Sequence, residues 1–494
     1  MIVHQELKGR HRELALLDEL WETADPTLLV LYGRRRVGKT HLMAHWLRDR
    51  QVRAIYWLAE PSSAQDQLRS FSQAIYKFAN PDTPAPASFT YATWQQAWEQ
   101  VAALAQTERL ALILDEFTTV LKINPDAANE LQNMWDDLLA QSNLFLTICG
   151  SHLALMQRYM LSEQSPLYGR TVQQLHLQPI SFIYTQDFLP QFGLVDRLAV
   201  YGIFGGIPAY WRQIEQYKSL SDETFYSLLQ PDCLIQVEAS LLLQDFTQDP
   251  HNYAAILRAI ARGSHTQKAI CTHSGLAQGH VSKYLSVLQD VGLVERQIPI
   301  TAKPKSRNGR YYITDPYLHF YFRLLADQQA RLALDERQLV FKEFVAGLGP
   351  FIDNNTLPEL CREWLLQAGM RGETALAVEQ VGGFWSQQTQ VDVVGFHPRE
   401  KAIILGACTL HNTGHVALLH DLIDKSAAVV PKTWKWRVAY VAISRKRWTE
   451  EAHQFAADKE RLAALAKDNW QPVAIHLLNL AQLDADLHRW ACAE

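Results

Sequence analysis

Short apolar runs alternate with longer stretches of helical periodicity through residue 180 of the chain. Strands that alternate with helices in this way predict a parallel sheet covered by helices. The expected strands are Leu28–Tyr32, Arg53–Leu58, Leu110–Leu114, Leu144–Cys149 and Leu175–Leu177. A proline-rich stretch at 80–86 separates the helices between the second and third strands, so we expect a surface loop there.

A phosphate-binding sequence follows the first expected strand directly. It has the spacing G-x-x-x-x-G-K-T, and it reads Gly33-Arg34-Arg35-Arg36-Val37-Gly38-Lys39-Thr40, with His41 continuing into an expected helix. Glycines let such a loop curl, so that successive backbone N–H groups face phosphate oxygens beside the positive end of a helix. Lys39 is expected to reach the β- and γ-phosphates and Thr40 to ligate magnesium. The alternative is a glycine-rich turn without a ligand, and the flanking strand and helix count against it.

Two acids end the third expected strand. Asp115 and Glu116 follow Leu110–Leu114 directly. An aspartate at the end of a buried strand, one sheet position from the phosphate-binding loop, is suited to hold the magnesium shell. Glu116 then fits a general base that polarises the attacking water. Two solvated acids are the alternative, and the upstream loop favours the functional interpretation.

Ser151 follows the fourth expected strand, between the other two strand ends. A polar side chain there would sense the γ-phosphate or the attacking water. Serine is also favoured as a helix N-cap, and a helix is expected from Leu153. The sequence leaves both roles open.

Together these motifs resemble the archaeal-type ATPase family, which belongs to the P-loop NTPases near the AAA+ and STAND groups. The similarity covers residues 1–245 and includes Leu7-Lys8-Gly9-Arg10-His11-Arg12-Glu13, Leu167-Tyr168-Gly169-Arg170 and Gly205-Gly206-Ile207-Pro208-Ala209-Tyr210. The resemblance implies that Gly9 and Arg10 pack against the nucleotide base and that Pro208, in a helical lid, lies near the adenine. It also implies ATP and Mg²⁺ as cofactors and ATP hydrolysis as the activity.

Several arginines have two interpretations. The resemblance implies a catalytic contact of Arg170 with a γ-phosphate, often that of a neighbouring subunit, where a guanidinium stabilises developing charge. The alternative for Arg170 is an ion pair with a surface carboxylate. Arg34, Arg35 and Arg36 would assist the phosphates, or would contact another subunit or nucleic acid.

Length and composition set the wider frame. A chain of 494 residues is expected to form about three domains. We expect an α/β multidomain fold with a P-loop ATPase core at 1–188, a helical lid at 189–247, a winged helix-turn-helix at 248–325, and a connector with a nuclease-like domain at 326–494. The net charge of −5 argues against a uniformly basic coat for nucleic acid but not against a local basic patch.

The cysteines and apolar runs indicate the compartment. The 6 cysteines lie far apart without a C-x-x-C pair, as expected of reduced residues. The segment Met1–Glu6 does not begin a signal peptide, and no apolar run approaches the roughly 18 residues needed to span a bilayer. We therefore expect a cytoplasmic protein without membrane contact.

A helix-turn-helix pattern occupies residues 266–296. Its longer helix has apolar positions at i, i+3, i+4 and i+7, namely Val281, Tyr284, Leu285 and Leu288. With this face buried, we expect the side chains of four residues to point outward, namely Gln278, His280, Ser282 and Lys283. With a following hairpin, the segment resembles the winged helix-turn-helix.

The expected wing is basic at its tip. Residues 296–310 contain no acid and five cations, which are Arg296, Lys303, Lys305, Arg307 and Arg310. Such a hairpin suits a phosphate backbone, so DNA contact is expected through Lys303, Lys305, Arg307 and Arg310, together with Gln278, His280 and Lys283. The alternative is a protein-binding winged helix with a solvated tip.

The last part of the chain resembles the C-terminal domain that follows archaeal-type ATPases, a relative of the PD-(D/E)xK nucleases. Glu359 and Asp392 stand where that family places its helix glutamate and strand aspartate. Where E-x-K is expected, the chain has Ala407-Cys408-Thr409, so one metal carboxylate and the lysine are missing. We expect no cutting by this site. His411 and His415 are nearby, and we expect them to cap or pack rather than bind metal.

The sequence thus predicts a magnesium-dependent ATP-binding and hydrolysing switch that couples its nucleotide state to a winged helix and an inactive nuclease-like domain on DNA. A second hypothesis is a STAND-like signalling or scaffolding ATPase that acts on a protein partner with little turnover. A third is an active nuclease that uses an unrecognised acid. Contact of Arg170 with a neighbouring subunit would imply a ring or a transient dimer, whereas a STAND-like protein could rest as a monomer.

Overall fold

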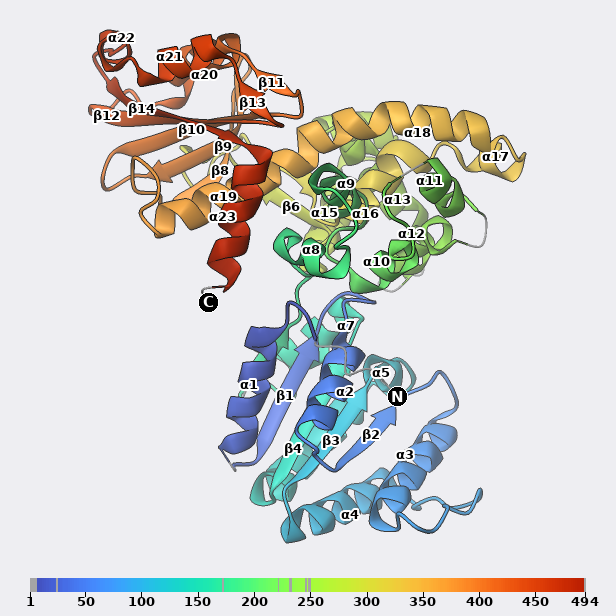
Figure 1. Cartoon of the computed structure of the whole chain (residues 1–494). Coiled ribbons are helices and arrows are strands. Elements are labelled where there is room, and N and C mark those ends of the chain that lie inside the picture. Colours follow the sequence, from blue (N-terminus) through green and yellow to red (C-terminus); the bar gives the residue numbers. More distant parts are fainter. Residues whose placement is uncertain are drawn as a thin grey trace. The chain divides into compact units, whose positions relative to one another are not determined.

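The computed structural model describes residues 7–492 except 24, 171–172, 221, 231–232, 245–246 and 248–249. Its residues group into two compact units (Figure 1). The first comprises Met1–Ile180, Gly206–Gln213 and Gln244–Gln248, and the second comprises Ser181–Gly205, Ile214–Leu243 and Asp249–Glu494. The expectation about Met1–Glu6 falls on residues outside the described part.

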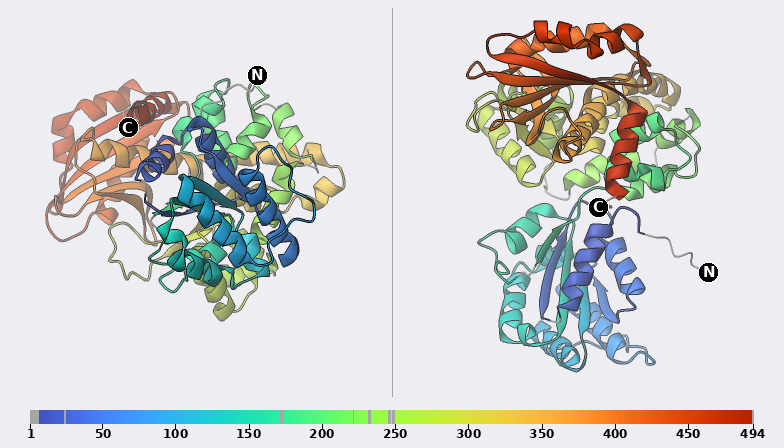
Figure 2. Two further views of the ribbon diagram at one scale, coloured as in Figure 1. Left: turned by 90° about the horizontal axis from the view of Figure 1, so that it is seen from below. Right: turned by 60° about the vertical axis from the view of Figure 1, so that its left-hand side comes forward.

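The first unit is built on a five-stranded sheet with the order β2-β3-β4-β1-β5. Its strands are β1 (Thr27–Tyr32), β2 (Ala54–Leu58), β3 (Leu110–Asp115), β4 (Leu144–Gly150) and β5 (Gln173–His176), and all adjacent pairs are parallel. Helices pack on both faces (Figure 2), which is why β3 and β4 are buried along their whole length and mostly apolar. The parallel sheet predicted from the alternating pattern is confirmed.

The helices of this unit follow the predicted alternation. They are α1 (His11–Glu22), α2 (Lys39–Asp49), α3 (Ala64–Ala79), α4 (Trp94–Thr107), α5 (Thr118–Ile123), α6 (Ala127–Asp137), α7 (Leu153–Met156) and α10 (Pro208–Ile214). Aromatic side chains fill the space between helices and sheet, as where the Trp21 and Trp46 rings meet edge to face at 5.6 Å.

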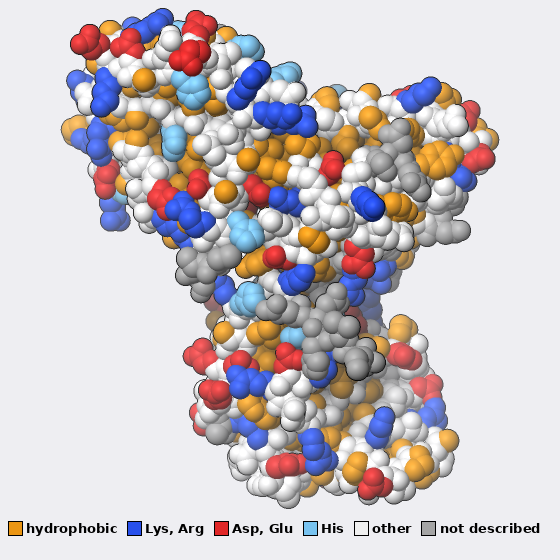
Figure 3. All heavy atoms as spheres, viewed as in Figure 1, with side chains coloured by type: hydrophobic (Ala, Val, Ile, Leu, Met, Phe, Trp, Pro, Cys, Tyr) orange, Lys and Arg blue, Asp and Glu red, His pale blue; other side chains and the backbone are white. Residues whose placement is uncertain are grey.

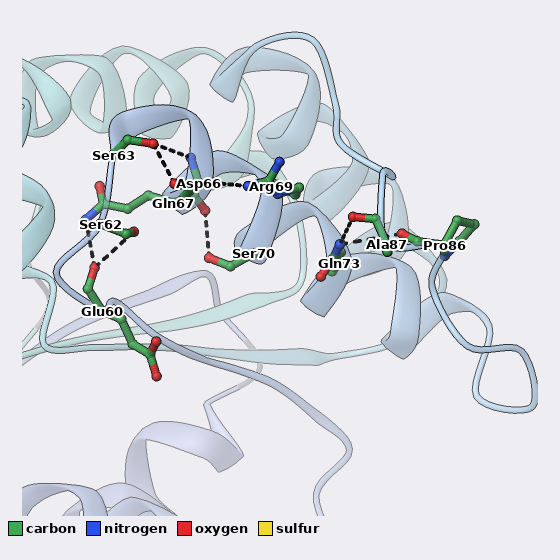
Figure 4. A network of polar contacts seen from close by, with 10 residues as sticks. All are labelled: Glu60, Ser62, Ser63, Asp66, Gln67, Arg69, Ser70, Gln73, Pro86 and Ala87. Atoms are coloured by element: carbon green, nitrogen blue, oxygen red, sulfur yellow. Dashed lines mark hydrogen bonds and ion pairs between the residues drawn. The ribbon is translucent and has the colours of Figure 1, made fainter.

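Helix α3 begins at a polar cap that also fixes the segment after β2 (Figure 4). The Ser63 hydroxyl oxygen accepts from the Asp66 N–H at 3.1 Å, as favoured at an N-cap, and Gln67 Nε2 donates to the Glu60 carbonyl at 3.3 Å. At the other end of the network, Gln73 Nε2 donates to the Ala87 carbonyl at 3.0 Å. The exposed 80–86 loop, expected from its prolines, is thereby attached to α3.

The second unit begins with helices. They are α8 (Thr185–Phe188), α9 (Leu194–Phe204), α11 (Asp222–Leu228), α12 (Leu234–Gln244), α13 (Pro250–Ala261), α14 (Gln267–Ser274) and α15 (Gln278–Asp290). An antiparallel hairpin of β6 (Val294–Gln297) and β7 (Arg310–Ile313) follows. A connector of α16 (Pro316–Phe320), α17 (Gln329–Ala333) and α18 (Arg337–Phe351) leads to the C-terminal sheet.

Helix α15 buries the side that its periodicity predicted. Val281, Leu285 and Leu288 are fully buried, and Tyr284 is half-buried with its hydroxyl accepting from Asn252 Nδ2 at 3.1 Å. The four positions predicted to point outward, Gln278, His280, Ser282 and Lys283, are all exposed.

The C-terminal sheet has the order β14-β12-β10-β9-β8. Its strands are β8 (Gln380–Trp385), β9 (Gln390–His397), β10 (Ala402–Thr409), β12 (Trp436–Ser444) and β14 (Trp470–Asn479), and short strands β11 (Thr413–Gly414) and β13 (Arg447–Trp448) pair beside it. Strand β9 pairs antiparallel with β8 and β10, whereas β12 pairs parallel with β10 and β14. In Figure 1, one face carries α20 (Val416–Val429) and α21 (Glu450–Ala457), and the other carries α19 (Leu357–Met370) and α23 (Leu480–Cys492). Helix α22 (Lys459–Ala464) precedes β14.

The segment predicted as a lid, 189–247, is divided between the units. Gly206–Gln213 groups with the first unit, whereas most of the flanking helices group with the second. None of the helices in the described part of the chain is long and apolar enough to cross a membrane.

Candidate nucleotide site

The loop between β1 and α2 is fixed at its glycines. The Leu177 N–H donates to the Tyr32 carbonyl at 2.8 Å, and a Cβ on Gly33 would lie 2.6 Å from the Leu177 oxygen. Any side chain at Gly33 would therefore push the two segments apart. Gly38 has a φ of +107°, which glycine adopts without strain, and α2 starts at the next residue. The strand–loop–helix setting predicted for this motif is confirmed.

The Lys39 ammonium folds back across the loop. Its Nζ donates to the carbonyl oxygens of Gly33 at 2.9 Å and Arg34 at 3.3 Å, and the residue is only 5% exposed. A buried ammonium has to keep hydrogen-bond partners. The two carbonyls therefore hold Lys39 over the curled backbone, where the predicted phosphates would compete for it.

Asp115 is the centre of the polar contacts at the carboxyl ends of the parallel strands. Its Oδ2 accepts from the Thr40 hydroxyl at 2.7 Å and from the Tyr56 hydroxyl, and its Oδ1 accepts from the Glu116 N–H at 3.0 Å. Burial, reinforced by the Asp115 carboxylate, raises the pKa of Tyr56, so this phenol stays protonated and donates. The structure thus brings together Thr40 and Asp115, the two residues predicted as magnesium ligands.

Tyr56 is a site residue that sequence reasoning missed. It lies on β2, two residues before Leu58, which pairs with Asp115 across the sheet. The available signal was one phenol in an otherwise apolar strand. That signal does not reveal which face of the sheet the hydroxyl reaches.

Glu116 and Ser151 meet at the ends of neighbouring strands. Glu116 has a φ of +52°, and the Ser151 hydroxyl donates to its Oε2 at 2.8 Å. Helix α7 is capped instead by His152, whose Nδ1 accepts from the Leu155 N–H at 3.4 Å. Of the two roles left open for Ser151, the contacts favour the one beside the predicted general base.

The amino-terminal motif packs on the same loop. Arg10 donates to the Val37 carbonyl at 3.1 Å and to Glu13 Oε1 at 2.9 Å, and it is 4% exposed. Burial lowers the pKa of Arg10 from its usual range, and Glu13 opposes this shift. Gly9 precedes it with a φ of +70°. Arg10 therefore contacts the loop, and the packing of Gly9 and Arg10 against the base stays a prediction.

Helix α10 also reaches the loop. Arg34 donates to the Tyr210 hydroxyl at 3.1 Å, and its guanidinium carbon lies 5.3 Å from the centre of that ring. Burial lowers the pKa of His41 at the start of α2, and Arg212 of α10 adds to this shift. Pro208 is the first residue of α10. A motif that is far away in the sequence thus adjoins the predicted phosphate-binding loop.

Arg170 has a different environment from these residues. Its guanidinium forms a two-pronged ion pair with Asp136 of α6, with both distances at 2.6 Å, and also donates to the Pro166 carbonyl at 3.2 Å. The hydrogen bond from Arg170 lowers the pKa of Asp136. In the described part of the chain, Arg170 thus forms an ion pair with a surface carboxylate, which was the alternative to a phosphate contact.

The positions predicted to carry nuclease metal ligands are bridged by a cation of the chain itself. Arg362 donates to Glu359 Oε1 at 2.5 Å and to the Asp392 carbonyl oxygen at 2.6 Å. Burial raises the pKa of the Cys361 thiol, and contact with Cys408 raises it further. In the described part of the chain, no group of three or more His, Cys, Asp or Glu side chains is placed to hold a metal ion.

The predicted DNA contacts are accessible except for one. Gln278, His280 and Lys283 lie on the exposed side of α15, and Lys303, Lys305 and Arg307 are exposed in the β6–β7 loop. Arg310 is half-buried and donates to Gln390 Oε1 at 2.9 Å.

Comparison with known families agrees with this geometry. Residues 8–214 match the model of an ATPase domain found predominantly in Archaea, and residues 321–418 match that of archaeal and bacterial proteins of unknown function. An uncharacterized protein of Methanocaldococcus jannaschii is 28% identical over 392 residues, which is 79% of this chain and 84% of that protein. An uncharacterized ATP-binding protein of the same organism is 41% identical over 45 residues, 9% of this chain and 76% of that protein.

The solved structure of a Walker-type ATPase of Pyrococcus abyssi aligns with this chain at a TM-score of 0.49 and 18% identity. The alignment covers 64% of this chain and 95% of the Pyrococcus chain. The structure of Cdc6p of Pyrobaculum aerophilum aligns at a TM-score of 0.34 and 16% identity, over 69% of this chain and 95% of the Cdc6p chain. Residues 8–214, with the β1–α2 loop, Asp115 and Glu116 at the carboxyl ends of parallel strands, thus form a P-loop ATPase domain that matches the archaeal ATPase family model, and residues 321–418 match the model of a second family.

Proposed function

We propose that this ATPase is a magnesium-dependent switch that couples its nucleotide state to a winged helix at 248–325 and to an inactive nuclease-like C-terminal domain, acting on DNA. One observation supports the catalytic part above all. Asp115 accepts from Thr40 at 2.7 Å, and the adjacent Glu116 accepts from Ser151 at 2.8 Å, at the same edge as the Lys39 loop. This is the arrangement that phosphoryl transfer to water requires.

The residues present fit a magnesium ion. Thr40 and Asp115 offer a hydroxyl and a carboxylate oxygen close together, and hard oxygen ligands are those that Mg²⁺ prefers. These two residues would hold the ion, which supplies positive charge to the β- and γ-phosphate oxygens when bound. Tyr56 and the Glu116 N–H keep the Asp115 carboxylate oriented for it.

The chain's own groups have separate roles in the proposed reaction. Lys39 moves from the carbonyls of Gly33 and Arg34 to the phosphates, because a triphosphate is the stronger acceptor for an ammonium. Glu116 orients the attacking water with Oε1 and accepts its proton, while Ser151 holds Oε2. Gly9, Arg10 and Pro208 border the base.

A contribution of Arg170 requires a second subunit in this proposal. Its pair with Asp136 would open, and the guanidinium would then reach the γ-phosphate bound by a neighbouring copy. Self-association in the presence of nucleotide is therefore part of the proposal for this residue.

The DNA-binding part rests on the distribution of charge. Figure 3 shows cationic and anionic side chains mixed over the face viewed, in keeping with the net charge of −5. The 296–310 segment differs, because it contains five cations and no acid. The exposed side of α15 adds Gln278, His280 and Lys283, at the place where a winged helix reads a groove.

The C-terminal domain is proposed to lack nuclease activity for two reasons. Ala407-Cys408-Thr409 replaces the acid and lysine of the active family, and the Glu359 carboxylate is already paired with the Arg362 guanidinium, which also donates to the main-chain carbonyl of Asp392. Plasmid incubated with the protein and Mg²⁺ or Mn²⁺ should remain unnicked. Nicking that persists after purification would contradict this part.

Turnover of ATP tests the catalytic assignment. Lys39→Ala and Glu116→Gln should each reduce hydrolysis by about a hundredfold or more, because a preorganised charge or the base is removed. Lys77→Ala, at an exposed lysine of α3, is the matched control and should retain the wild-type rate. Wild-type rates in both site variants would refute the assignment.

A STAND-like ATPase that acts on a protein partner is the second candidate. Its supporting observation is the acidic net charge of −5. The measurement that separates the two is binding of a fluorescent DNA duplex at low salt. Saturable binding supports the DNA proposal, and its absence supports the protein-partner candidate.

A further inference from the structure

The loop between β6 and β7 is attached to the C-terminal sheet. The Ile300 N–H donates to the Gly383 carbonyl at 2.9 Å, and Trp385 Nε1 donates to the Asn308 carbonyl at 2.9 Å. Two backbone positions of the loop, near its start and near its end, are thus bonded to β8. A free wing would have no such partners.

Arg310 completes this attachment. Its guanidinium donates to Gln390 Oε1 at 2.9 Å and lies 5.1 Å from the centre of the Trp385 ring. Trp385 is 6% exposed, and the Tyr312 ring meets it at 6.2 Å. A cation stacked on a buried indole and bonded to a neighbouring strand acts as a structural strut. Arg310 is therefore committed to the contact between the hairpin and the sheet.

The loop is also ordered from within. Arg296 donates to the Ser306 carbonyl at 2.9 Å, and Gly309 leaves the space that this guanidinium occupies, since a Cβ there would lie 2.3 Å from it. The Ser306 N–H donates to the Lys303 carbonyl at 2.9 Å and closes a turn. The backbone is fixed, and the three remaining cations, Lys303, Lys305 and Arg307, are exposed.

The turn between β8 and β9 resembles this loop, because its backbone is also fixed and its polar side chains are also exposed. The Ser386 N–H donates to the Thr389 carbonyl at 2.8 Å, which places Gln387 and Gln388 at the tip of a tight hairpin. Both side chains are exposed. Residues 380–391 contain no acid, and neither do residues 296–310, so the two attached segments carry five cations and no anion.

From these contacts we infer that the β6–β7 loop and the β8–β9 turn form one binding surface for the phosphate backbone of duplex DNA. Lys303, Lys305 and Arg307 supply the charge, and the amides of Gln387 and Gln388 donate to phosphate or sugar oxygens, as neutral amides do in DNA complexes. The C-terminal domain thereby contributes directly to DNA contact. This inference rests on the proposed DNA binding and adds the β8–β9 turn to it.

The test uses the full chain and a fluorescent duplex of mixed sequence, titrated at two salt concentrations. Lys303→Ala with Lys305→Ala and Arg307→Ala should reduce the slope of log affinity against log salt by about 2.7, that is three contacts at about 0.9 each. Gln387→Glu with Gln388→Glu should weaken binding by about tenfold, because two anions then face the phosphates. Gln338→Glu with Gln454→Glu, at exposed positions of α18 and α21, changes the net charge equally and should bind nearly as wild type.

The outcomes are distinguishable. If the wild type binds and the Gln387/Gln388 variant matches the Gln338/Gln454 control, the shared surface is wrong while DNA binding through the hairpin stands. If the wild type does not bind at low salt, the proposed DNA function fails as well. A second measurement tests the attachment without DNA. Gln390→Ala should speed tryptic cleavage after Lys305 and Arg307 by about tenfold, since local opening sets the rate of proteolysis, and unchanged cleavage would overturn the strut.

Discussion

At the scale of single residues, the nucleotide site is a set of side chains whose partners lie on other elements of the first unit. Asp115 on β3 accepts from Thr40 at the start of α2 and from Tyr56 on β2, and Glu116 accepts from Ser151 after β4. Each carboxylate thus has its orientation fixed by a donor on, or just after, a neighbouring strand. In the proposed site these donors do not contact a phosphate themselves. They orient the two carboxylates that act on the magnesium ion and the attacking water.

Tyr56→Phe should raise the Mg²⁺ concentration for half-maximal ATP turnover by about tenfold. Removing one hydrogen bond to a charged acceptor costs about 1.5–3 kcal/mol, and the ring itself is retained. Tyr76→Phe is the control, because Tyr76 lies on α3 away from these contacts. A Tyr56→Phe protein with an unchanged magnesium dependence would show that Asp115 is oriented without the phenol.

Ser151→Ala should lower kcat for ATP by about tenfold and leave KM nearly unchanged. The serine holds the Glu116 carboxylate and not the nucleotide. We therefore expect the substitution to weaken stabilisation of the transition state and to leave ATP binding unchanged. Steady-state kinetics beside Ser62→Ala, an exposed serine before α3, measures this. A rise in KM with constant kcat would instead mean that Ser151 binds the ground-state nucleotide.

At the scale of elements, most of α10 groups with the first unit, although the segment Ser181–Gly205 that precedes it in the sequence groups with the second. Gly206 makes this possible. Its carbonyl accepts from the Ile180 N–H at 2.8 Å, and a Cβ at this position would lie 1.8 Å from the Ile180 oxygen. The close backbone approach brings Tyr210 to Arg34 of the phosphate-binding loop.

Gly206→Ala should therefore destabilise the first unit by about 1–3 kcal/mol and weaken ATP binding, because backbone has to move away from backbone. Gly279→Ala is the matched control, since no atom lies within 4 Å of the added methyl group. Thermal melting with and without nucleotide measures both effects. Equal melting temperatures for the two variants would contradict the proposed anchoring of α10.

At the scale of the whole molecule, residues far apart in the sequence hold the second unit together. Arg197 on α9 donates to Asp484 on α23 at 2.7 Å, across 287 positions of sequence, and Arg197 is 5% exposed. Breaking such a pair leaves a buried charge without its partner. This contact ties the beginning of the second unit to the end of the described chain.

Asp484→Ala should destabilise the second unit by about 3–5 kcal/mol, and Arg197→Met with Asp484→Leu should recover much of that loss. Asp421→Ala, which removes a surface pair with Lys425 on α20, should cost about 1 kcal/mol or less. Calorimetry of the full chain separates these cases. A double variant that is no more stable than Asp484→Ala would show that the pair is a net source of stability.

The sequence alone determined the parallel sheet, the phosphate-binding loop and the two acids at and directly after the end of β3. These features are local, because a buried strand, a glycine at positive φ and a strand end are each set within a few neighbouring residues. The buried face of α15 was predictable for the same reason. The helical period places Val281, Leu285 and Leu288 on one side.

The tertiary structure decided which distant groups meet. Tyr56 reaches Asp115 only because β2 pairs with β3, and Arg310 is removed from the predicted DNA contacts because Trp385 and Gln390, at least 75 positions later, receive it. Arg170 is bound by Asp136 in the same way. The partner of a cation depends on which carboxylate, amide or ring the fold brings near, and sequence spacing carries no information about that encounter.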